Sequence, residues 1–261
     1  MSILGEIVKY KQRELEVSIQ KKPLERLQNE VSRLPKKKNL FFKAIKKPKK
    51  IAIIAEIKKR SPSRGILRKD FKPVEIARAY EAAGASALSI LTDENFFGGS
   101  LSIFKKIRAA THLPLLRKDF TIDRYQIYES KLIGADAVLL IADILSAEEL
   151  ERLSVIADEL GMDVLFEVHH LGDIEKITRL KPKIIGINNR DLHTFQVDLG
   201  TTERLIKQLP KGALVISESG IQNSEDLIYL KRLGVRAALV GESLMKEKDP
   251  GSALLKLRAG V

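Results

Sequence analysis

Cysteine is absent from the 261-residue sequence, which excludes disulfides, thiolate metal sites and thiol nucleophiles. Long apolar runs are absent too: the longest hydrophobic stretches have the length of strands, and charges are spread through the first 17 residues. A signal peptide and a membrane-spanning helix are therefore not expected. Together these absences favour a soluble, cytoplasmic protein.

The motif G-x-G-x-x-G is missing from the turn that follows the strongly apolar stretch at residues 51–57. That turn reads SPSRG, at residues 61–65. Dinucleotide-binding turns need these glycines because the backbone must approach the pyrophosphate closely. Dinucleotide binding therefore lacks its main support in the sequence.

Acidic residues are too few to balance the basic ones, since 46 Lys and Arg face 34 Asp and Glu and the net charge is +12. Such an excess is typical of nucleic-acid binding. However, the lysine-rich stretches at 36–38 and 46–50 lack the interleaved aromatic residues of a single-strand binding platform. We expect a small, multiply anionic substrate and no nucleic acid as primary partner.

From residue 51 onward one unit recurs eight times: a short apolar run, a polar tip and an amphipathic helical stretch. The apolar runs are 51–57, 87–91, 115–117, 137–141, 164–168, 184–188, 213–217 and 237–241. Strands that alternate with helices predict parallel pairing through crossovers. Eight such units favour a closed (β/α)8 TIM barrel, an α/β fold, over an open doubly wound sheet.

Residues 1–50 precede the first unit and are predicted to form an N-terminal helical extension. Apolar residues recur with helical spacing over 3–18, Pro23 begins a second helix, and a third short helix covers 40–45. We therefore expect this extension followed by a barrel over residues 51–261, as one structural domain.

Polar residues at the strand tips are the candidate catalytic groups, because TIM-barrel sites form at the carboxyl ends of the strands. Glu56 and Lys58 lie two residues apart, so they share one side of an extended chain. The other tips supply these candidates: Lys118, Glu167, Asn188, Arg190 and Glu218. Amines beside carboxylates suit acid–base chemistry, whereas a surface salt bridge is the alternative for the first tip alone.

An anion site is predicted where the last two strands end. Ser219-Gly220 and Gly241-Glu242 can offer backbone N–H groups to a phosphate. Strands one and eight are neighbours in a closed barrel, so Ser61 can complete the site. The alternative is that each glycine serves only a tight turn.

Two other chemistries fit the sequence less well. His169 and His170 are adjacent, so on a strand their side chains point to opposite faces and cannot both bind one ion. We therefore expect no metal site there. Ser219 as a nucleophile lacks a histidine base in its own unit.

Seven segments, in order along the barrel, together resemble the indole-3-glycerol-phosphate synthase family. They are AEIKKRSPSRG (55–65), LSILTDENFFGGS (88–100), LLRKDF (115–120), LFEVH (165–169), GINNRDL (186–192), ISESGI (216–221) and VGESLM (240–245). The resemblance implies a lyase of tryptophan biosynthesis that uses no cofactor. Its substrate, 1-(2-carboxyphenylamino)-1-deoxyribulose 5-phosphate, undergoes ring closure, decarboxylation and dehydration.

The resemblance also implies roles for the tip residues. Lys118 donates a proton to the ketone oxygen during ring closure, and Glu167 supports Lys118. Lys58 and Glu56 serve the loss of water. The remaining assignments are Asn188 and Glu218 on the sugar hydroxyls and lysines, and Arg190 near the substrate carboxylate.

Binding contacts follow from the same resemblance. The phosphate would rest on Ser61, Ser219, Gly220, Gly241 and Glu242, the last through its backbone N–H because its carboxylate would repel an anion. Walls for the aromatic ring are Phe97, Phe120, Leu139 and Leu192, with plain core packing as their alternative. The N-terminal helices would cover the barrel mouth, and no obligate protein partner or membrane is implied.

Two competing hypotheses remain at this point. A phosphosugar isomerase of the same pathway would share the glycine-rich anion site but would not need Glu56, Lys58, Lys118 and Glu167 together. A nucleic-acid-binding protein would show salt-dependent affinity for RNA or DNA and no loss on changing Lys118.

Overall fold

The structure is a computed structural model that describes residues 3–36, 38–48, 50–192 and 194–260. Lys37 and Lys49, which belong to the lysine-rich stretches, lie outside the described residues. Within the described residues, no helix is long and apolar enough to cross a membrane.

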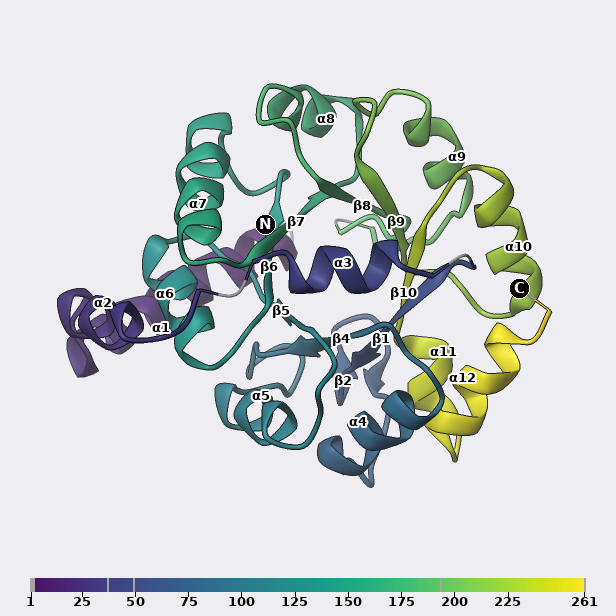
Figure 1. Ribbon diagram of the computed structural model, residues 1–261, viewed down its shortest axis with the longest axis horizontal. Coiled ribbons are helices and arrows are strands. Elements are labelled where there is room, and N and C mark those ends of the chain that lie inside the picture. The colour runs from purple at the N-terminus through teal and green to yellow at the C-terminus, as the bar shows by residue number, and fades with distance from the viewer. Residues whose placement is uncertain (1–2, 37, 49, 193, 261) are drawn as a thin grey trace.

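Parallel strands close into an eight-stranded barrel (Figure 1), as the repeating pattern predicts. Strand β1 (Ala52–Ile57) pairs with β4 (Ala87–Leu91) on one side and with β10 (Ala237–Val240) on the other. The ring continues through β5 (Leu115–Lys118), β6 (Ala137–Ile141), β7 (Asp163–Val168), β8 (Ile184–Asn188) and β9 (Leu214–Glu218). Because all eight strands of the barrel run in parallel, their carboxyl ends meet at one end of the barrel.

Residues that alternate along each strand pack into two separate cores. In β1, Ile53 and Ala55 face the outer helices, whereas Ala52 and Ile54 fill the barrel interior. Both faces are buried, which explains the unbroken apolar run of this strand.

Helices surround the barrel, and local residues in the sequence determine where several of them begin and end. They are α4 (Pro73–Ala82), α5 (Leu101–Arg108), α6 (Arg124–Leu132), α7 (Ala147–Glu159), α8 (Leu171–Thr178), α9 (Gly200–Ile206), α10 (Ser224–Arg232), α11 (Glu242–Lys246) and α12 (Pro250–Arg258). Ser146 caps α7 by accepting a hydrogen bond from the backbone N–H of Glu149. Gly84 and Gly134 follow α4 and α6 at φ +80° and +86°, as predicted for short helix-to-strand loops.

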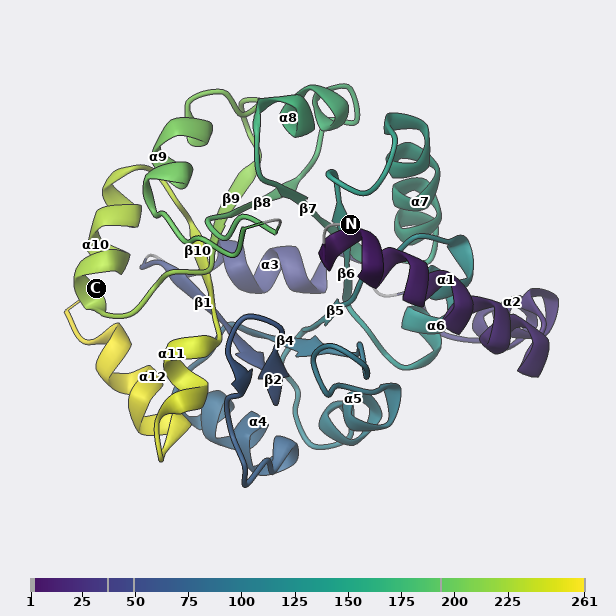
Figure 2. The same cartoon turned by 180° about the vertical axis from the view of Figure 1, so that it is seen from behind.

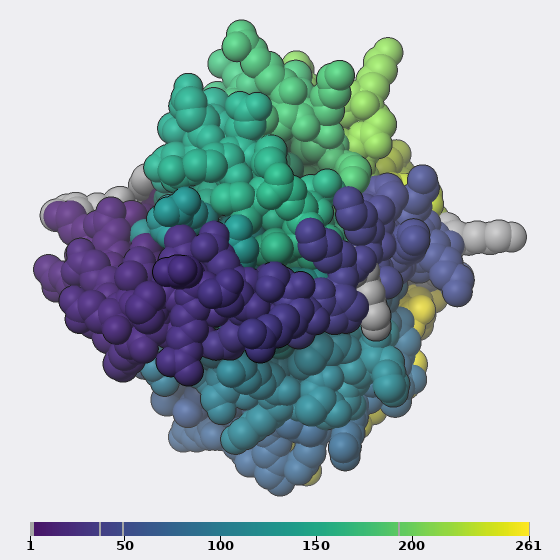
Figure 3. All heavy atoms as spheres, turned by 60° about the vertical axis from the view of Figure 1, so that its left-hand side comes forward, coloured from purple at the N-terminus to yellow at the C-terminus, as the bar shows by residue number. Residues whose placement is uncertain are grey.

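Three helices precede the barrel: α1 (Ile3–Lys21), α2 (Leu24–Ser32) and α3 (Leu40–Lys46). Their segment runs along the outside of the barrel (Figure 3), where the Tyr125 hydroxyl of α6 donates to the Ser18 carbonyl. Helix α1 lies on one end of the barrel and α3 across the other (Figures 1 and 2).

Helix α3 corrects the expectation that the N-terminal helices cover the barrel mouth. Phe41 and Ile45 are buried in the interior core beside Ala52 and Ala137, which begin strands. The backbone N–H of Phe42 donates to Asp163, the first residue of β7, at 2.9 Å. Helix α3 therefore closes the amino-terminal end, because its apolar side fills the open bottom of the barrel interior. Of the three described N-terminal helices, α1 contacts the end that carries the strand tips.

Candidate active site

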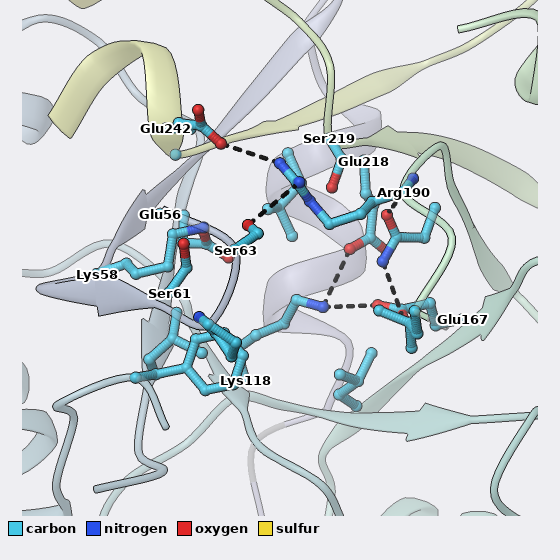
Figure 4. A pocket seen from close by; sticks show the side chains of 18 of the residues that line it. Glu56, Lys58, Ser61, Ser63, Lys118, Glu167, Arg190, Glu218, Ser219 and Glu242 are labelled. Atoms are coloured by element: carbon cyan, nitrogen blue, oxygen red, sulfur yellow. Dashed lines mark hydrogen bonds and ion pairs between the residues drawn. The ribbon is translucent and has the colours of Figure 1, made fainter. Parts of the chain in front are cut away.

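A cavity of about 950 Å³, part of it open to solvent, lies at the carboxyl ends of the strands. Figure 4 shows its polar side chains converging from different strands. The structure brings every residue predicted for the site to the lining of this cavity. They are Glu56, Lys58, Ser61, Phe97, Lys118, Phe120, Leu139, Glu167, Asn188, Arg190, Leu192, Glu218, Ser219, Gly220, Gly241 and Glu242.

Lys118, the last residue of β5, lies between two glutamates from neighbouring strands. Its Nζ is 2.6 Å from Oε2 of Glu167 and 3.2 Å from Oε2 of Glu218. Burial alone would lower the pKa of Lys118, but the surrounding carboxylates outweigh burial and raise it. Lys118 is therefore held as an ammonium, which is the form of a proton donor.

The two glutamates beside Lys118 differ in protonation. Burial favours the neutral form of Glu167, yet Lys118 and His169 hold the pKa of Glu167 below its ordinary value. Burial raises the pKa of Glu218 to about 8, and the nearby charge of Glu167 adds to this rise. Carboxyl groups whose pKa values are pushed apart are typical of acid–base sites.

Glu56 and Lys58 face each other at the end of β1, as their spacing predicts. Lys58 Nζ lies 2.5 Å from Oε1 of Glu56. Gly241 leaves room for this carboxylate, because a Cβ at that position would overlap Oε1 of Glu56. A Cβ at Gly186 would likewise overlap Oε1 of Glu218. At both positions glycine allows the backbone to approach a site carboxylate.

The loops that are predicted to bind an anion meet on the β1, β9 and β10 side of the cavity. The Ser61 hydroxyl is buried and has no hydrogen-bond partner among the described residues. Ser219 and Gly220 both have positive φ, +66° and +84°. Left-handed backbone at a non-glycine residue is costly and clusters at functional sites, which supports a binding role for Ser219.

Arg190 lies on this side of the cavity, where it contacts Glu242. Its Nη2 is 2.9 Å from Oε2 of Glu242, and its Nη1 is 3.4 Å from the Ser63 hydroxyl. Glu242 is also paired with Arg64 at 3.2 Å and with Lys246 at 2.6 Å. Burial would raise the pKa of Glu242, but these cations hold it below its ordinary value.

The apolar wall is formed by the aromatic rings of Phe97 and Phe120, whose centroids are 6.1 Å apart. Leu192 packs nearby, while Leu139 is only 2% exposed and belongs to the interior core. Leu139 therefore both lines the cavity and fills the barrel.

Lys11, beside the site, carries no signal in the sequence that predicts its position, whereas its partners Asp93 and Asp119 follow apolar runs, as expected for residues at strand tips. Lys11 of α1 is buried and contacts Asp93 and Asp119, beyond the ends of β4 and β5. Asp119 also accepts from the Thr92 hydroxyl at 2.6 Å. These contacts hold the chain directly after Lys118.

The two adjacent histidines point apart. His169 Nε2 lies 3.2 Å from Oε1 of Glu167, whereas the ring of His170 lies between Asp143 and Asp173. They do not converge on one point, but this is not the strand geometry assumed from their spacing, because both residues lie beyond the end of β7.

The closed barrel, with lysines and glutamates that converge in a cavity at the carboxyl ends of its strands, has the architecture of a (β/α)8 enzyme. The family profile described as "Indole-3-glycerol phosphate synthase" matches residues 4–257. The chain is 46% identical over 258 residues to the protein of that name from Acetivibrio thermocellus, covering 98% of this chain and 99% of the other. It is 50% identical over 244 residues to the one from Caldanaerobacter subterraneus subsp. tengcongensis, covering 94% and 93%. The chain therefore belongs to the indole-3-glycerol phosphate synthase family, a family of decarboxylating lyases of tryptophan biosynthesis.

Solved structures of low sequence identity share the fold. A thiamine phosphate pyrophosphorylase from Pyrococcus furiosus superposes with a TM-score of 0.59 at 17% identity, covering 80% of this chain and 94% of that chain. KGPDC from Streptococcus mutans has a TM-score of 0.61 at 11% identity, covering 80% and 96%. At these identities the comparison supports the barrel alone.

Proposed function

We propose that this protein converts 1-(2-carboxyphenylamino)-1-deoxyribulose 5-phosphate to indole-3-glycerol phosphate. The observation that carries the proposal is the Lys118 ammonium between Glu167 and Glu218, in a cavity with an anion-binding side and an aromatic wall. Family membership over nearly the whole chain supports this reaction rather than that of a phosphosugar isomerase.

The substrate would span the cavity. Its phosphate takes the backbone N–H groups of Ser219, Gly220, Gly241 and Glu242 and the free hydroxyl of Ser61. Its aromatic ring packs against the apolar wall, which is formed by Phe97, Phe120, Leu139 and Leu192. Binding both ends leaves the ketone between the catalytic groups.

Ring closure forms a bond between the ring carbon that carries the carboxylate and the ketone carbon. Lys118 donates its proton to the ketone oxygen, which becomes a hydroxyl. Glu167 balances the positive charge that develops on the ring nitrogen. Loss of CO2 returns its bonding electrons to the ring and neutralises that nitrogen.

Dehydration completes the aromatic product. Lys58 protonates the departing hydroxyl, and Glu56 accepts the proton released on the ring side; their 2.5 Å contact lets this pair return the proton afterwards. Asn188 and Glu218 orient the sugar hydroxyls and the lysines. Before CO2 is lost, Arg190 binds the substrate carboxylate, and its ion pair with Glu242 is then weakened or broken.

The proposal includes a cytoplasmic location and a small phosphorylated compound as the partner, with no nucleic acid as primary partner. The lack of cysteine supports a reducing compartment. The basic charge favours a substrate with both a phosphate and a carboxylate.

Formation of indole-3-glycerol phosphate, followed by absorbance or fluorescence, tests the proposal. We expect product with the unaltered protein and near-abolition with Lys118→Ala. Exposed Lys105 on α5 provides a matched control, and Lys105→Ala should keep full activity. Circular dichroism checks that both variants fold. If the unaltered protein forms no product, the proposed function is wrong, and phosphosugar isomerase substrates should be tried next.

A further inference from the structure

His169 lies directly after β7, on the turn that leads into α8. Its backbone N–H donates to Oδ2 of Asp173 at 2.9 Å, and the same oxygen accepts from the His170 N–H at 3.3 Å. Asp173 is buried, so this turn is firmly held. The imidazole of His169 is also largely buried, with 9% of its side chain exposed.

The imidazole contacts Glu167 from outside the cavity lining. Oε1 of Glu167 lies 3.2 Å from His169 Nε2 and accepts from Asn188 Nδ2 at 3.1 Å. Oε2 lies 2.6 Å from Lys118 Nζ. The two carboxylate oxygens therefore have different tasks, since one is occupied by the histidine and the amide and the other holds the proposed acid.

We propose that His169 is a positioning residue of the reaction, whose Nε2–H fixes the Glu167 carboxylate so that Oε2 stays aligned on Lys118. This inference rests on the proposed function. Without the histidine, only Asn188 would hold Oε1, and the carboxylate could rotate away from the ammonium. A small displacement of a catalytic group is costly because it changes the reacting geometry.

Electrostatics keep the imidazole in a donor form. Burial lowers the pKa of His169, but Glu167, Asp173 and Asp143 together raise it above its ordinary value. On the far side of Glu167, Lys118 and Glu218 complete the charged groups around this turn. Both the imidazolium and the neutral Nε2–H tautomer can donate to Oε1 of Glu167.

Two amide replacements separate the donor role from packing. The Gln amide nitrogen is the same number of bonds from Cα as Nε2, whereas the Asn amide nitrogen matches Nδ1, which has no partner among the described residues. We expect His169→Gln to keep kcat within about three-fold. His169→Asn should lower kcat about ten-fold or more, with little change in KM, as expected when a hydrogen bond to a charged group is lost.

Equal losses in both variants would overturn the proposal, as would full activity of His169→Asn. Thermal unfolding should be the same for both, so a difference in kcat cannot come from stability. If the unaltered protein makes no product, the proposed function fails before this comparison is reached.

A second measurement is independent of turnover. The sequence has four histidines, so their imidazole signals can be titrated by NMR in the full protein. In Glu167→Gln, burial of His169 remains but its carboxylate partner is lost, so the pKa of His169 should fall. Exposed His112 is the internal control and should not move. An unchanged His169 pKa would show that the ring does not act on Glu167.

Discussion

The ammonium of Lys11 lies 3.0 Å from a carboxylate oxygen of Asp119, the residue that follows Lys118 in the chain. Helix α1 is thus joined by a buried ion pair to the strand end that carries the proposed acid. Lys11 also lies 3.1 Å from Asp93 and is 2% exposed. Burial would lower the pKa of Lys11, but Asp119 and Asp93 outweigh it and raise that pKa.

Lys11→Met should therefore destabilise the protein and impair catalysis together. It would leave two buried carboxylates without their shared cation, at a cost of about 3 kcal/mol in the free energy of unfolding. Repulsion between Asp93 and Asp119 would also shift the end of β5, so kcat should fall. Urea unfolding and turnover measure both effects, with exposed Lys9→Met as the control. Stability equal to that of the control would show that the ion pair contributes nothing.

The burial of Lys11 could not be predicted from the sequence. It lies among Lys9, Arg13 and Glu14 in a charged helix and looks like a solvated residue. Its partners Asp93 and Asp119 are distant in sequence, so no local pattern marks it as buried. By contrast, the strands and their tips could be predicted, because apolar runs and the polar residues after them are adjacent in the chain.

The placement of α3 is a second case that only tertiary packing decides. Phe41 and Ile45 form a small apolar face at helical spacing. That face is compatible with either end of the barrel, and the contact with Asp163 selects the amino-terminal one. The hairpin of β2 (Arg60–Ser61) and β3 (Gly65–Ile66) also escaped prediction, since two-residue strands leave no periodicity.

Glu218→Gln should stabilise the protein above about pH 8 while it removes most activity. Burial raises the pKa of Glu218 to about 8, so the folded protein keeps a proton that the unfolded chain releases near its ordinary pKa. The contribution of Glu218 to the free energy of unfolding is therefore largest below its ordinary pKa and declines as the pH rises from there to about 8. Glutamine stays neutral, so the variant should gain up to about 5 kcal/mol at alkaline pH.

Unfolding curves at pH 5 and pH 9 measure this difference for Glu218→Gln. Exposed Glu225→Gln on α10 is the control and should show no pH-dependent gain. A gain of equal size at both pH values would mean that the pKa of Glu218 is not raised. A stabilised but inactive variant would show that the site keeps Glu218 buried at the expense of stability.

Glu242→Gln should strengthen phosphate binding. The Glu242 carboxylate pairs with Arg64, Arg190 and Lys246 beside the proposed anion loops. Removing its negative charge leaves these cations available to a bound phosphate and removes the repulsion between the carboxylate and the phosphate. The KM and the inhibition constant of inorganic phosphate should therefore fall about three- to ten-fold. The effect should shrink as salt is added. Exposed Glu247→Gln is the control, and weaker phosphate inhibition in Glu242→Gln would contradict the placement of the anion site.

Gly241→Ala should lower kcat by about ten-fold or more because of a steric conflict with Glu56. A Cβ at residue 241 would overlap Oε1 of Glu56, whose carboxylate contacts Lys58. Gly172 in α8 provides a matched control, since a Cβ there meets nothing within 4 Å and its helical backbone accepts alanine. Gly172→Ala should keep full activity and gain up to about 1 kcal/mol in stability. Normal turnover in Gly241→Ala would mean that Glu56 can move without loss, which would remove it from the dehydration step.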